Sequence, residues 1–134
     1  MRNNETNLTI TQMAETIGLS THTLRYWEQE GLIEGVQRNS GNQRRYRTDD
    51  IEWVRFLLRL KETGMHISQM RRYAKLRKAG TSTLIERRDM LIAHRQAILS
   101  QIAKLNSHKH ALDSKISIYD QMITNQQGDT YDPH

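Results

Sequence analysis

Residues 9–31 read TITQMAETIGLSTHTLRYWEQEG, and the fold that we expect follows from this stretch. Residues 9–12 fit a capping box, in which a Thr hydroxyl meets the backbone N–H three residues on and a Gln reaches back. Apolar residues then recur as one helical stripe until Gly18, which suits the left-handed position after a helix. Ser20 can cap a second helix that runs to about Glu30. Two short helices joined by a tight turn that contains glycine are typical of a helix-turn-helix.

The second of these helices carries candidate DNA-reading side chains. Leu24 and Trp27 lie three residues apart, so both are predicted to face the core. His22 and Arg25 lie on the other side, near the N-terminal end that normally enters the major groove. Arginine suits a bidentate bond to guanine or a phosphate clamp, and the Tyr26 hydroxyl can meet a phosphate. The alternative is a solvated polar helix face around a core tryptophan.

The helical period disappears between residues 32 and 47. Residues 39–42 read NSGN, a dense turn signal, which predicts a short two-stranded hairpin, a wing. The hairpin carries four arginines, Arg38, Arg44, Arg45 and Arg47. A run of charge is usually only solvated surface, but a second DNA contact belongs directly after a helix-turn-helix. Position and residue type agree here, and they favour DNA binding.

Two further helices are expected after the hairpin. Thr48 is expected to cap the first, which has acidic residues in its first turn, where the helix dipole favours anions, and which stops at Gly64. Its apolar residues cover more than one stripe, so it should be the most buried element. The next helix is expected over residues 68–79, before Gly80. It should bury Met70, Tyr73, Ala74 and Leu76.

The last segment predicts one long helix. Thr83 and Glu86 fit another capping box, and nothing breaks the helix before Gly128. About 42 residues at ~1.5 Å rise would reach roughly 60 Å, longer than a small domain is wide. Apolar residues recur every seventh position, with further ones four residues later, which is the seam of a coiled coil. The predicted dimer interface consists of Leu84, Leu91, Ile98, Ile102, Leu105, Leu112, Ile116, Tyr119 and Ile123.

A lone helix cannot bury such a seam, so it needs a partner surface. Arg88, Arg95 and Lys109 occupy seam positions and weaken the prediction of a two-stranded coiled coil locally. Their long stems can snorkel, or that end of the helix can pack on the N-terminal domain. The alternative is packing against the chain's own third and fourth helices. We favour a second copy of the chain.

Composition narrows the function classes. The 134 residues include no cysteine, which excludes disulfides, thiolate zinc sites, Fe–S clusters and a cysteine nucleophile. Residues 1–80 hold 14 Lys and Arg against 9 Asp and Glu, whereas residues 81–134 hold 6 of each. A basic module joined to a neutral one suggests a polyanion partner for the first. No run of about 18 apolar residues and no leader are present, so we expect a cytoplasmic protein without a membrane partner.

These patterns predict a mainly α protein, in which a winged helix-turn-helix domain with a two-stranded wing is followed by a long C-terminal dimerisation helix. We expect a disordered N-terminus over residues 1–7 and a DNA-binding domain with linking helices over residues 8–80. A coiled-coil dimerisation helix is expected over residues 81–126, and a flexible tail over residues 127–134.

The order and spacing of several short motifs are specific. The motifs are Leu8-Thr9-Ile10, Gly18-Leu19-Ser20, Thr23-Leu24-Arg25-Tyr26-Trp27-Glu28, Gly31-Leu32-Ile33, and Arg44-Arg45-Tyr46 with Asp50 after it. Over roughly residues 8–64 they resemble the MerR family of bacterial transcription regulators. Residues 63–65, residues 87–94 and the long final helix extend the resemblance, less specifically, to the subgroup that answers to aldehydes or nitrosative stress.

The resemblance implies a homodimer joined by an antiparallel pair of C-terminal helices. Such proteins bind a pseudo-palindrome between promoter elements whose spacing is too long for RNA polymerase holoenzyme, and activate by bending and untwisting that DNA. It implies that Arg25 and Tyr26 contact DNA from the helix and Arg44 from the wing, and that amides beside Thr9 and Ser20 meet phosphate. The predicted DNA-contact residues are Thr9, Ser20, Thr21, His22, Arg25, Tyr26, Arg38, Arg44, Arg45 and Tyr46.

The sequence departs from the family pattern in three places. Glu34-Gly35 stands where a proline is usual, and Asn42 stands where the wing glycine is common, although Asn tolerates a positive φ. Sensing members of the subgroup carry a cysteine on the third helix, where this chain has FLLRL over residues 56–60. Thiol redox, alkylation and soft-metal sensing are therefore excluded chemically.

Other sites are weakly indicated. His108 and His110 are two residues apart on different helix faces, so no metal site is predicted. No Gly-rich phosphate loop, serine nucleophile or paired carboxylates stand out, so we expect no cofactor and no enzyme. Four methionines could line an apolar effector pocket between the fourth helix and the partner's long helix, although Met at helical spacing more often belongs to a core. They are Met65, Met70, Met90 and Met122.

The sequence thus predicts a sequence-specific transcriptional regulator that, as a homodimer, binds an inverted-repeat promoter operator and distorts it. The first alternative is an architectural DNA-bending protein without transcription activation, which the dimer seam disfavours. The second is a coiled-coil interaction or ligand-sequestering protein that does not use DNA. The inducer, the operator, and activation as against repression do not follow from these residues.

Overall fold

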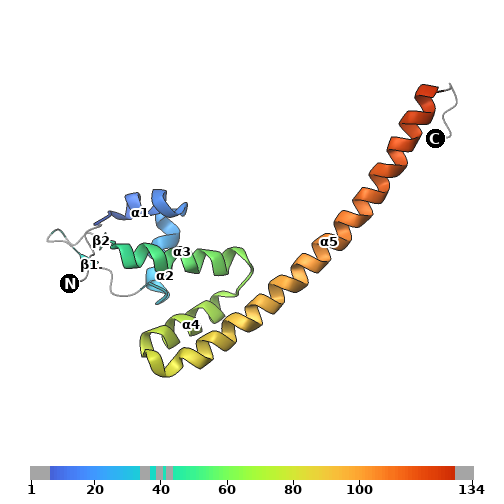
Figure 1. Ribbon diagram of the computed structural model, residues 1–134. Helices are drawn as coiled ribbons and strands as arrows, with labels where there is room; N and C mark the ends of the chain where they lie inside the picture. Colours follow the sequence, from blue (N-terminus) through green and yellow to red (C-terminus); the bar gives the residue numbers. More distant parts are fainter. Residues whose placement is uncertain (1–6, 34–36, 39–40, 42–43, 129–134) are drawn as a thin grey trace. The chain divides into compact units, whose positions relative to one another are not determined.

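The computed structural model describes residues 7–33, 37–38, 41 and 44–128. Residues 1–6 and 129–134, parts of the predicted disordered ends, lie outside this description. The chain divides into two compact units, one up to Leu91 and one from Ile92. The elements, drawn in Figure 1, are α1 (Ile10–Ile17), α2 (Thr21–Gln29), β1 (Gln37–Arg38), β2 (Arg44–Arg45), α3 (Thr48–Glu62), α4 (Ile67–Ala79), a 3₁₀ turn (Thr81–Thr83) and α5 (Leu84–Gly128).

The first two helices begin and end as the sequence predicts. The Thr9 hydroxyl accepts from the Gln12 backbone N–H at 3.1 Å, and the Thr9 N–H donates to Gln12 Oε1 at 2.9 Å. Gly18 follows α1 with φ of 87°, a left-handed conformation that favours glycine. The Ser20 hydroxyl accepts from the Thr23 N–H at 3.0 Å and so caps α2. Both predicted caps are confirmed, and they bound two helices across a turn of three residues.

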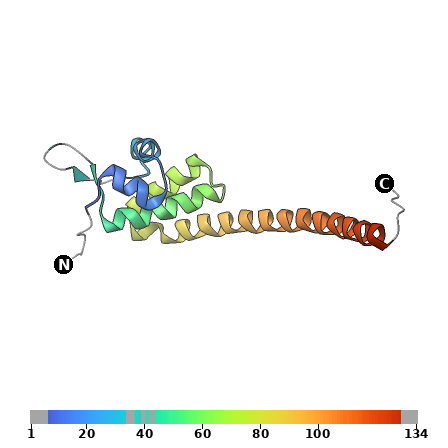
Figure 2. The same cartoon turned by 90° about the horizontal axis from the view of Figure 1, so that it is seen from above.

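Helices α1–α4 of the first unit pack around one core (Figures 1 and 2). Leu24 and Trp27 are buried, which confirms the predicted inner face of α2. As predicted, α3 buries the most residues, four of them along its length. The buried apolar residues are Met13, Ala14, Leu24, Trp27, Leu32, Ile33, Tyr46, Trp53, Val54, Leu57, Leu60, Met70, Tyr73 and Ala74.

Trp53 holds three parts of the first unit together. Its indole Nε1 donates to the Leu32 carbonyl at 2.7 Å, a buried hydrogen bond that ties α3 to the segment after α2. Its ring stacks on Tyr73 of α4 with 6.0 Å between the centroids. The Arg77 guanidinium lies 4.1 Å from the centre of the Trp53 ring, a cation–π contact.

A small antiparallel sheet lies between α2 and α3 in the chain. Residues of β1 and β2 pair as Gln37 with Arg45 and Arg38 with Arg44, where the sequence predicts a hairpin. Of the predicted turn, residues 39–42, only Gly41 is among the described residues. Directly after β2, Tyr46 exchanges two backbone hydrogen bonds with Leu8, at 2.8 and 2.9 Å.

The start of α3 differs from the prediction. Thr48 is the first helical residue and not the cap, because Arg47 occupies the cap position. The Arg47 backbone N–H donates to Asp50 Oδ2 at 2.8 Å. An acidic side chain in the first turn therefore reaches back to this helix end, as in half of a capping box, and a Thr hydroxyl is not used.

The start of α4 also differs, by one residue. The helix begins at Ile67, where the sequence predicts Ser68. The reason is His66, whose Nδ1 lies 3.3 Å from the Ser68 backbone N–H and accepts from it. A neutral imidazole has one acceptor nitrogen and can therefore cap a helix, although serine and aspartate are the usual residues there.

Thr83 does not cap α5, contrary to the predicted capping box with Glu86. Its side chain is buried, and its hydroxyl lies 2.5 Å from the Leu76 carbonyl and 2.8 Å from the Gly80 carbonyl. Arg87 Nε donates to the Thr83 hydroxyl at 3.0 Å, and Arg87 Nη2 donates to the Gly80 carbonyl at 2.9 Å. Thr83 therefore satisfies carbonyls at the end of α4, which need partners as much as the start of α5 does.

In the second unit, from Ile92, α5 is the predicted continuous helix, and it ends at Gly128, two residues beyond the predicted end at residue 126. Its apolar side chains are mostly exposed, and the exposed fraction of Leu105 reaches 67%. In the first unit, Leu91 packs against the core cluster, whereas Leu84 is 55% exposed. The other predicted interface residues are Ile98, which is half-buried, and Ile102, Leu105, Leu112, Ile116, Tyr119 and Ile123, which are exposed.

Candidate nucleic-acid interface

The outer face of α2 exposes polar side chains, and its inner face is held in the core by buried residues. His22, Arg25 and Tyr26 are exposed, whereas Leu24 and Trp27 beneath them are buried. The buried pair fixes the rotation of the helix about its axis, and the Ser20 cap fixes its first turn. The residues predicted to read DNA from this helix are therefore directed outward together.

Within the described part of the chain, Arg25 makes only one weak side-chain contact. Its Nη1 lies 3.5 Å from the Thr21 hydroxyl, at the outer limit of a hydrogen bond. A guanidinium has five N–H donors, so nearly all of its hydrogen-bonding capacity stays available. Little intramolecular energy is lost when such a group turns to a base edge or a phosphate.

A hollow of about 600 Å³ lies beside this face, and we call it the recognition hollow. It is formed by α2 together with the end of α3 and the start of α4. Lys61 lies 5.9 Å from the centre of the Trp27 ring, in cation–π contact. The lining residues are His22, Thr23, Tyr26, Trp27, Lys61, Gly64, Met65, His66, Ile67 and Met70.

The recognition hollow adds two residues that the sequence analysis missed. Lys61 and His66 join the predicted His22 and Tyr26 around one concavity, although they are about 40 residues apart in the chain. Nothing in the local sequence marks Lys61, and His66 reads as an ordinary surface histidine. The adjacency arises from packing of the α3–α4 turn against α2, which only the structure gives.

The structure describes the side chain of only one of the three arginines in β1 and β2. Arg38 and Arg44 pair through their backbones, but their side chains lie outside the description. Arg45 is half-buried, and its Nε is buried without a hydrogen-bond partner within the described part of the chain. The predicted contacts of Arg38, Arg44 and Arg45 stay predictions.

The predicted DNA contact from the Tyr46 side chain is wrong. Tyr46 is fully buried, because its two backbone hydrogen bonds with Leu8 place it in the core of the first unit. A side chain with no accessible surface cannot touch a duplex, so Tyr46 supports the site from within. Thr9 and Ser20 act as helix caps, and Thr21 is half-buried beside Arg25.

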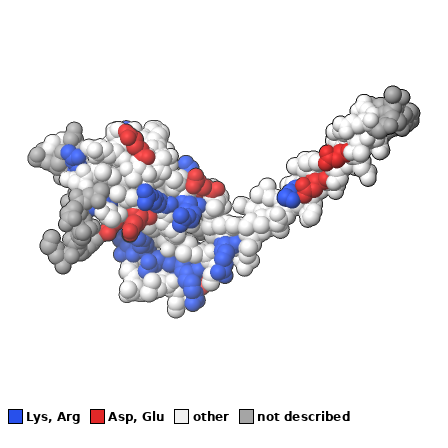
Figure 3. Space-filling model, turned by 45° about the horizontal axis from the view of Figure 1, so that its top comes forward, with Lys and Arg blue, Asp and Glu red and all other residues white. Residues whose placement is uncertain are grey.

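The basic excess of the first unit is concentrated on α4. This helix has five cations and no acid among its thirteen residues, whereas residues 1–66 hold nine cations and nine acids. The sequence analysis places the excess on residues 1–80 as a whole, and the finer count locates it on this one helix. The cations of α4 are exposed, and Figure 3 shows basic side chains gathered on the first unit. They are Arg71, Arg72, Lys75, Arg77 and Lys78.

Metal-ligand clusters, long apolar helices and the four methionines are considered next, for the described residues alone. No cluster of three or more His, Cys, Asp or Glu side chains suited to a metal is present in the ranges that the structure describes. No helix within those ranges is long and apolar enough to cross a membrane. Met70 is fully buried, and Met65 and Met90 pack against the core, while Met122 lies in the second unit, so the effector pocket stays a prediction.

Comparison with known protein families assigns the chain to one of them. The family described as "MerR HTH family regulatory protein" matches residues 8–77, more than half of the chain. This chain belongs to the MerR family. A second description, "MerR, DNA binding", matches residues 51–115, which extends the MerR assignment through α4 into α5. All ten predicted DNA-contact residues lie within the first match.

Several HTH-type transcriptional regulators are similar to the chain over most of its length. An uncharacterized HTH-type transcriptional regulator of Haemophilus influenzae is 33% identical over 111 residues, 83% of this chain and 82% of that protein. The HTH-type transcriptional regulator AdhR of Bacillus subtilis is 34% identical over 92 residues, 69% of this chain and 66% of that protein.

Solved MerR structures have the same fold. HiNmlR, a MerR family regulator lacking the sensor domain and bound to promoter DNA, superimposes with a TM-score of 0.80 at 31% identity. The match covers 88% of this chain and 94% of HiNmlR. A MerR family transcriptional regulator from Bacillus thuringiensis superimposes with a TM-score of 0.75 at 26% identity, over 84% of this chain and 99% of that one.

Proposed function

We propose that this MerR-family chain is a sequence-specific transcriptional regulator that, as a homodimer, binds an inverted-repeat promoter operator and distorts it. The observation that carries the proposal is the joint exposure of His22, Arg25 and Tyr26 on a capped helix. A helix of this kind fits the major groove with its N-terminal side chains on the base edges. The DNA-bound state of the related HiNmlR supports the same partner.

The proposed contacts divide by chemistry. Arg25 reads a base edge, since arginine pairs with guanine through two parallel hydrogen bonds. Tyr26, Lys61 and His66 contact the phosphate backbone along the recognition hollow, which places the duplex but carries no sequence information. The strand pair β1–β2 acts as the wing, with Arg44 as its contact.

The proposed dimer follows from the apolar seam of α5. Exposed leucine and isoleucine side chains recur along the second unit, and Tyr119 continues the repeat. Removal of these surfaces from water stabilises the folded dimer by about 25 cal/mol per Å². A two-fold dimer presents two copies of α2 to the two halves of an inverted repeat. We propose residues 8–80 for DNA binding and residues 81–126 for dimerisation.

The proposed output is control of RNA polymerase at a promoter in the cytoplasm. A dimer that grips two half-sites can bend or untwist the duplex between them, and the energy of that distortion comes from its phosphate contacts. Distortion alters the relative placement of the promoter elements on either side, which changes their recognition by the polymerase.

The test uses the DNA upstream of the gene that encodes this chain. Footprinting first locates the binding site there, and in-vitro transcription from the same DNA then measures the effect on the promoter. We expect a protected inverted repeat, and a change in open-complex formation on a promoter with an over-long spacer. The same promoter with a spacer of ordinary length is the control and should respond less. A footprint without any effect on transcription would instead support the architectural DNA-bending protein.

Salt dependence supplies a second readout. Each phosphate that a cation neutralises releases counterions, so the logarithm of affinity falls linearly with the logarithm of salt concentration. With several phosphate contacts in each half-site, we expect a steep decline. A flat response would remove the phosphate contacts from the proposal.

A further inference from the structure

The recognition hollow has an apolar side that phosphate contacts do not explain. Met65 and Ile67 are half-buried where they line it, and Tyr26, which is 43% exposed, contributes a phenol ring. Phosphate oxygens bond to N–H and O–H groups and gain nothing from such surface. The volume of about 600 Å³ lies within the range of small-molecule sites, about 300–1,000 Å³. The hollow is therefore suited to a compact ligand with an apolar part.

The apolar side favours an aromatic ring over an aliphatic chain. Met65 and Met70, two of the four methionines predicted to line an effector pocket, both line this hollow. The thioether sulfur of methionine makes favourable contacts with aromatic rings. Tyr26 offers a further ring, which can pack against another in an offset or edge-to-face arrangement.

The charged group of the hollow suits an anion. Among the described residues that line it, none is Asp or Glu, and Lys61 is the one permanent cation. Lys61 is exposed and makes no ion pair within the described part of the chain, where its contact is with the Trp27 ring. An ammonium group has three N–H donors, so this contact leaves donors available for a carboxylate.

His66 adds a neutral donor to the same hollow. The Ser68 backbone N–H can only donate, and it lies 3.3 Å from His66 Nδ1. Nδ1 is therefore the acceptor, so the proton of the neutral ring is on Nε2. An anion in the hollow can accept from Nε2 while Nδ1 continues to cap α4.

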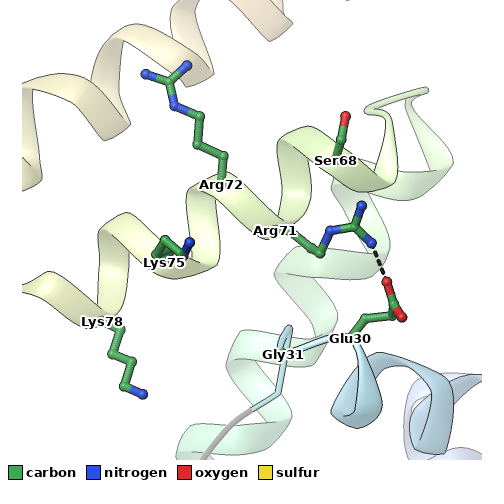
Figure 4. Close-up of a pocket in the computed structure, with 7 residues that line it drawn as sticks. All are labelled: Glu30, Gly31, Ser68, Arg71, Arg72, Lys75 and Lys78. Carbon is green, nitrogen blue, oxygen red and sulfur yellow. Dashed lines mark hydrogen bonds and ion pairs between the residues drawn. The ribbon is translucent and has the colours of Figure 1, made fainter.

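A second hollow, of about 520 Å³, lies between the C-terminal end of α2 and α4 and differs in both respects (Figure 4). It is lined by Glu30, Gly31, Ser68 and four cations of α4, with no aliphatic or aromatic side chain among the described lining residues. Glu30 forms an ion pair with Arg71 there, drawn as a dashed line in Figure 4. Apolar surface together with a cation and no acid is therefore a property of the recognition hollow and not of this second hollow.

We propose that the recognition hollow binds a small aromatic carboxylate, which competes with the operator for the same side chains. The carboxylate pairs with Lys61 and accepts from His66, and the ring packs against Met65 and Tyr26. The competition rests on the proposed function, because it requires that Tyr26, Lys61 and His66 contact the DNA backbone. Binding of the ligand by the free chain does not rest on it.

The experiment is a titration of the full chain with 2-naphthoate at constant ionic strength, followed by the indole N–H signals in ¹H–¹⁵N NMR. The chain has two tryptophans, and Trp27 lines the hollow, whereas Trp53 is not among the described lining residues. We expect a saturable shift of the Trp27 signal and almost none of the Trp53 signal. Equal shifts of both signals, or shifts that grow linearly, would overturn the site.

Two related compounds separate the contributions of charge and ring. 2-Naphthamide has the same ring without the charge and should bind at least tenfold more weakly. Acetate has the charge without the ring and should not saturate over the same concentrations. Binding of 2-naphthamide as tight as that of 2-naphthoate would overturn the assignment of a carboxylate, and saturation by acetate would overturn that of a ring.

A lysine variant locates the anion within the molecule. Lys61→Gln should weaken 2-naphthoate binding at least fivefold. The matched control is Lys75→Gln, which removes the same charge from an exposed position in the second hollow and should change affinity less than twofold. Equal losses in both variants, or no loss in either, would contradict the site. Thermal unfolding of each variant checks that it is folded.

Operator binding tests the competition and separates it from the proposed function. A ligand that binds only the DNA-free chain should lower the apparent operator affinity by a factor of one plus the ligand concentration divided by its Kd. 2-Naphthamide at the same concentration should have little effect. A saturable Trp27 shift with unchanged operator affinity would overturn the competition. A chain that binds no operator would contradict the proposed function, while the Trp27 titration would still decide the ligand site.

Discussion

The two units of this chain treat their apolar residues in opposite ways. Among its described residues, the first unit buries fourteen apolar side chains in one cluster, with Trp53 hydrogen-bonded inside it. The second unit leaves a regular series exposed, such as Leu105 at 67% and Leu112 at 64%. The first unit therefore has a core of its own, whereas the second gains its hydrophobic stabilisation only from another surface.

The comparison is tested most strongly by Leu105→Glu in the seam. A carboxylate in a dimer interface is desolvated without a partner, which costs about 3–5 kcal/mol, so dimer affinity should fall at least hundredfold. Sedimentation should show monomers, while the near-UV circular dichroism from Trp27 and Trp53 of the first unit should be unchanged.

The matched control is Ser107→Glu, two residues further along α5. Two residues turn a helix by roughly 200°, so this side chain lies opposite the seam and carries the same charge. It should leave the dimer intact. Dissociation by both variants, or by neither, would contradict the assignment of the seam.

Arg25→Ala tests whether DNA reading belongs to the first unit. Loss of one bidentate base contact costs about 1–3 kcal/mol, so affinity for the operator should fall roughly tenfold to hundredfold while non-specific binding changes little. Gel-shift titrations with operator and scrambled DNA measure both. Arg55→Ala, an exposed arginine on α3, is the control and should retain the preference. Undiminished sequence preference in Arg25→Ala would remove Arg25 from the site.

Trp53→Phe tests whether the first unit is stabilised by its own core. The change removes the indole N–H and leaves the Leu32 carbonyl buried without that donor, at a cost of about 1–3 kcal/mol. Chemical denaturation at a fixed protein concentration measures the loss. Sedimentation should still show dimers at moderate concentration, because α5 is unaltered. A loss of dimer without loss of stability would contradict the division into two units.

Ser20→Ala sharpens the comparison within the first unit and has the smallest expected effect. The Ser20 hydroxyl accepts the Thr23 N–H, and loss of such a cap costs about 1 kcal/mol. The midpoint of denaturation should shift slightly. Ser100→Ala, in the middle of α5 and exposed, is the control and should have no such effect.

Local patterns in the sequence predict the helices well and the distant pairings poorly. The caps at Thr9 and Ser20 and the buried pair Leu24 and Trp27 follow from spacing alone, because their partners lie within four residues. Tyr46 reads as a wing residue but is buried, because its partner Leu8 is 38 residues away. Thr83 reads as a cap but satisfies carbonyls at the end of the preceding helix, a choice that depends on the turn between them.

The candidate site also contains residues that local sequence patterns predict and residues that only the structure brings in. His22, Arg25 and Tyr26 could be found from the helix pattern, since helical period and residue type both mark them. Lys61 and His66 could not, because they reach the recognition hollow through the packing of α3 and α4. The excess of positive charge could be counted from the sequence. A count over 80 residues, however, does not show that the excess lies on the thirteen residues of α4.

The pairing of Leu8 with Tyr46 has a mechanical consequence. Leu8 directly precedes the cap Thr9, and Tyr46 directly follows β2. A force on the strand pair is therefore transmitted to the N-terminus of α1 through two short backbone hydrogen bonds. DNA contacts made by the hairpin and by the start of the first helix would then form and break together, so that dissociation from a duplex would occur in one step.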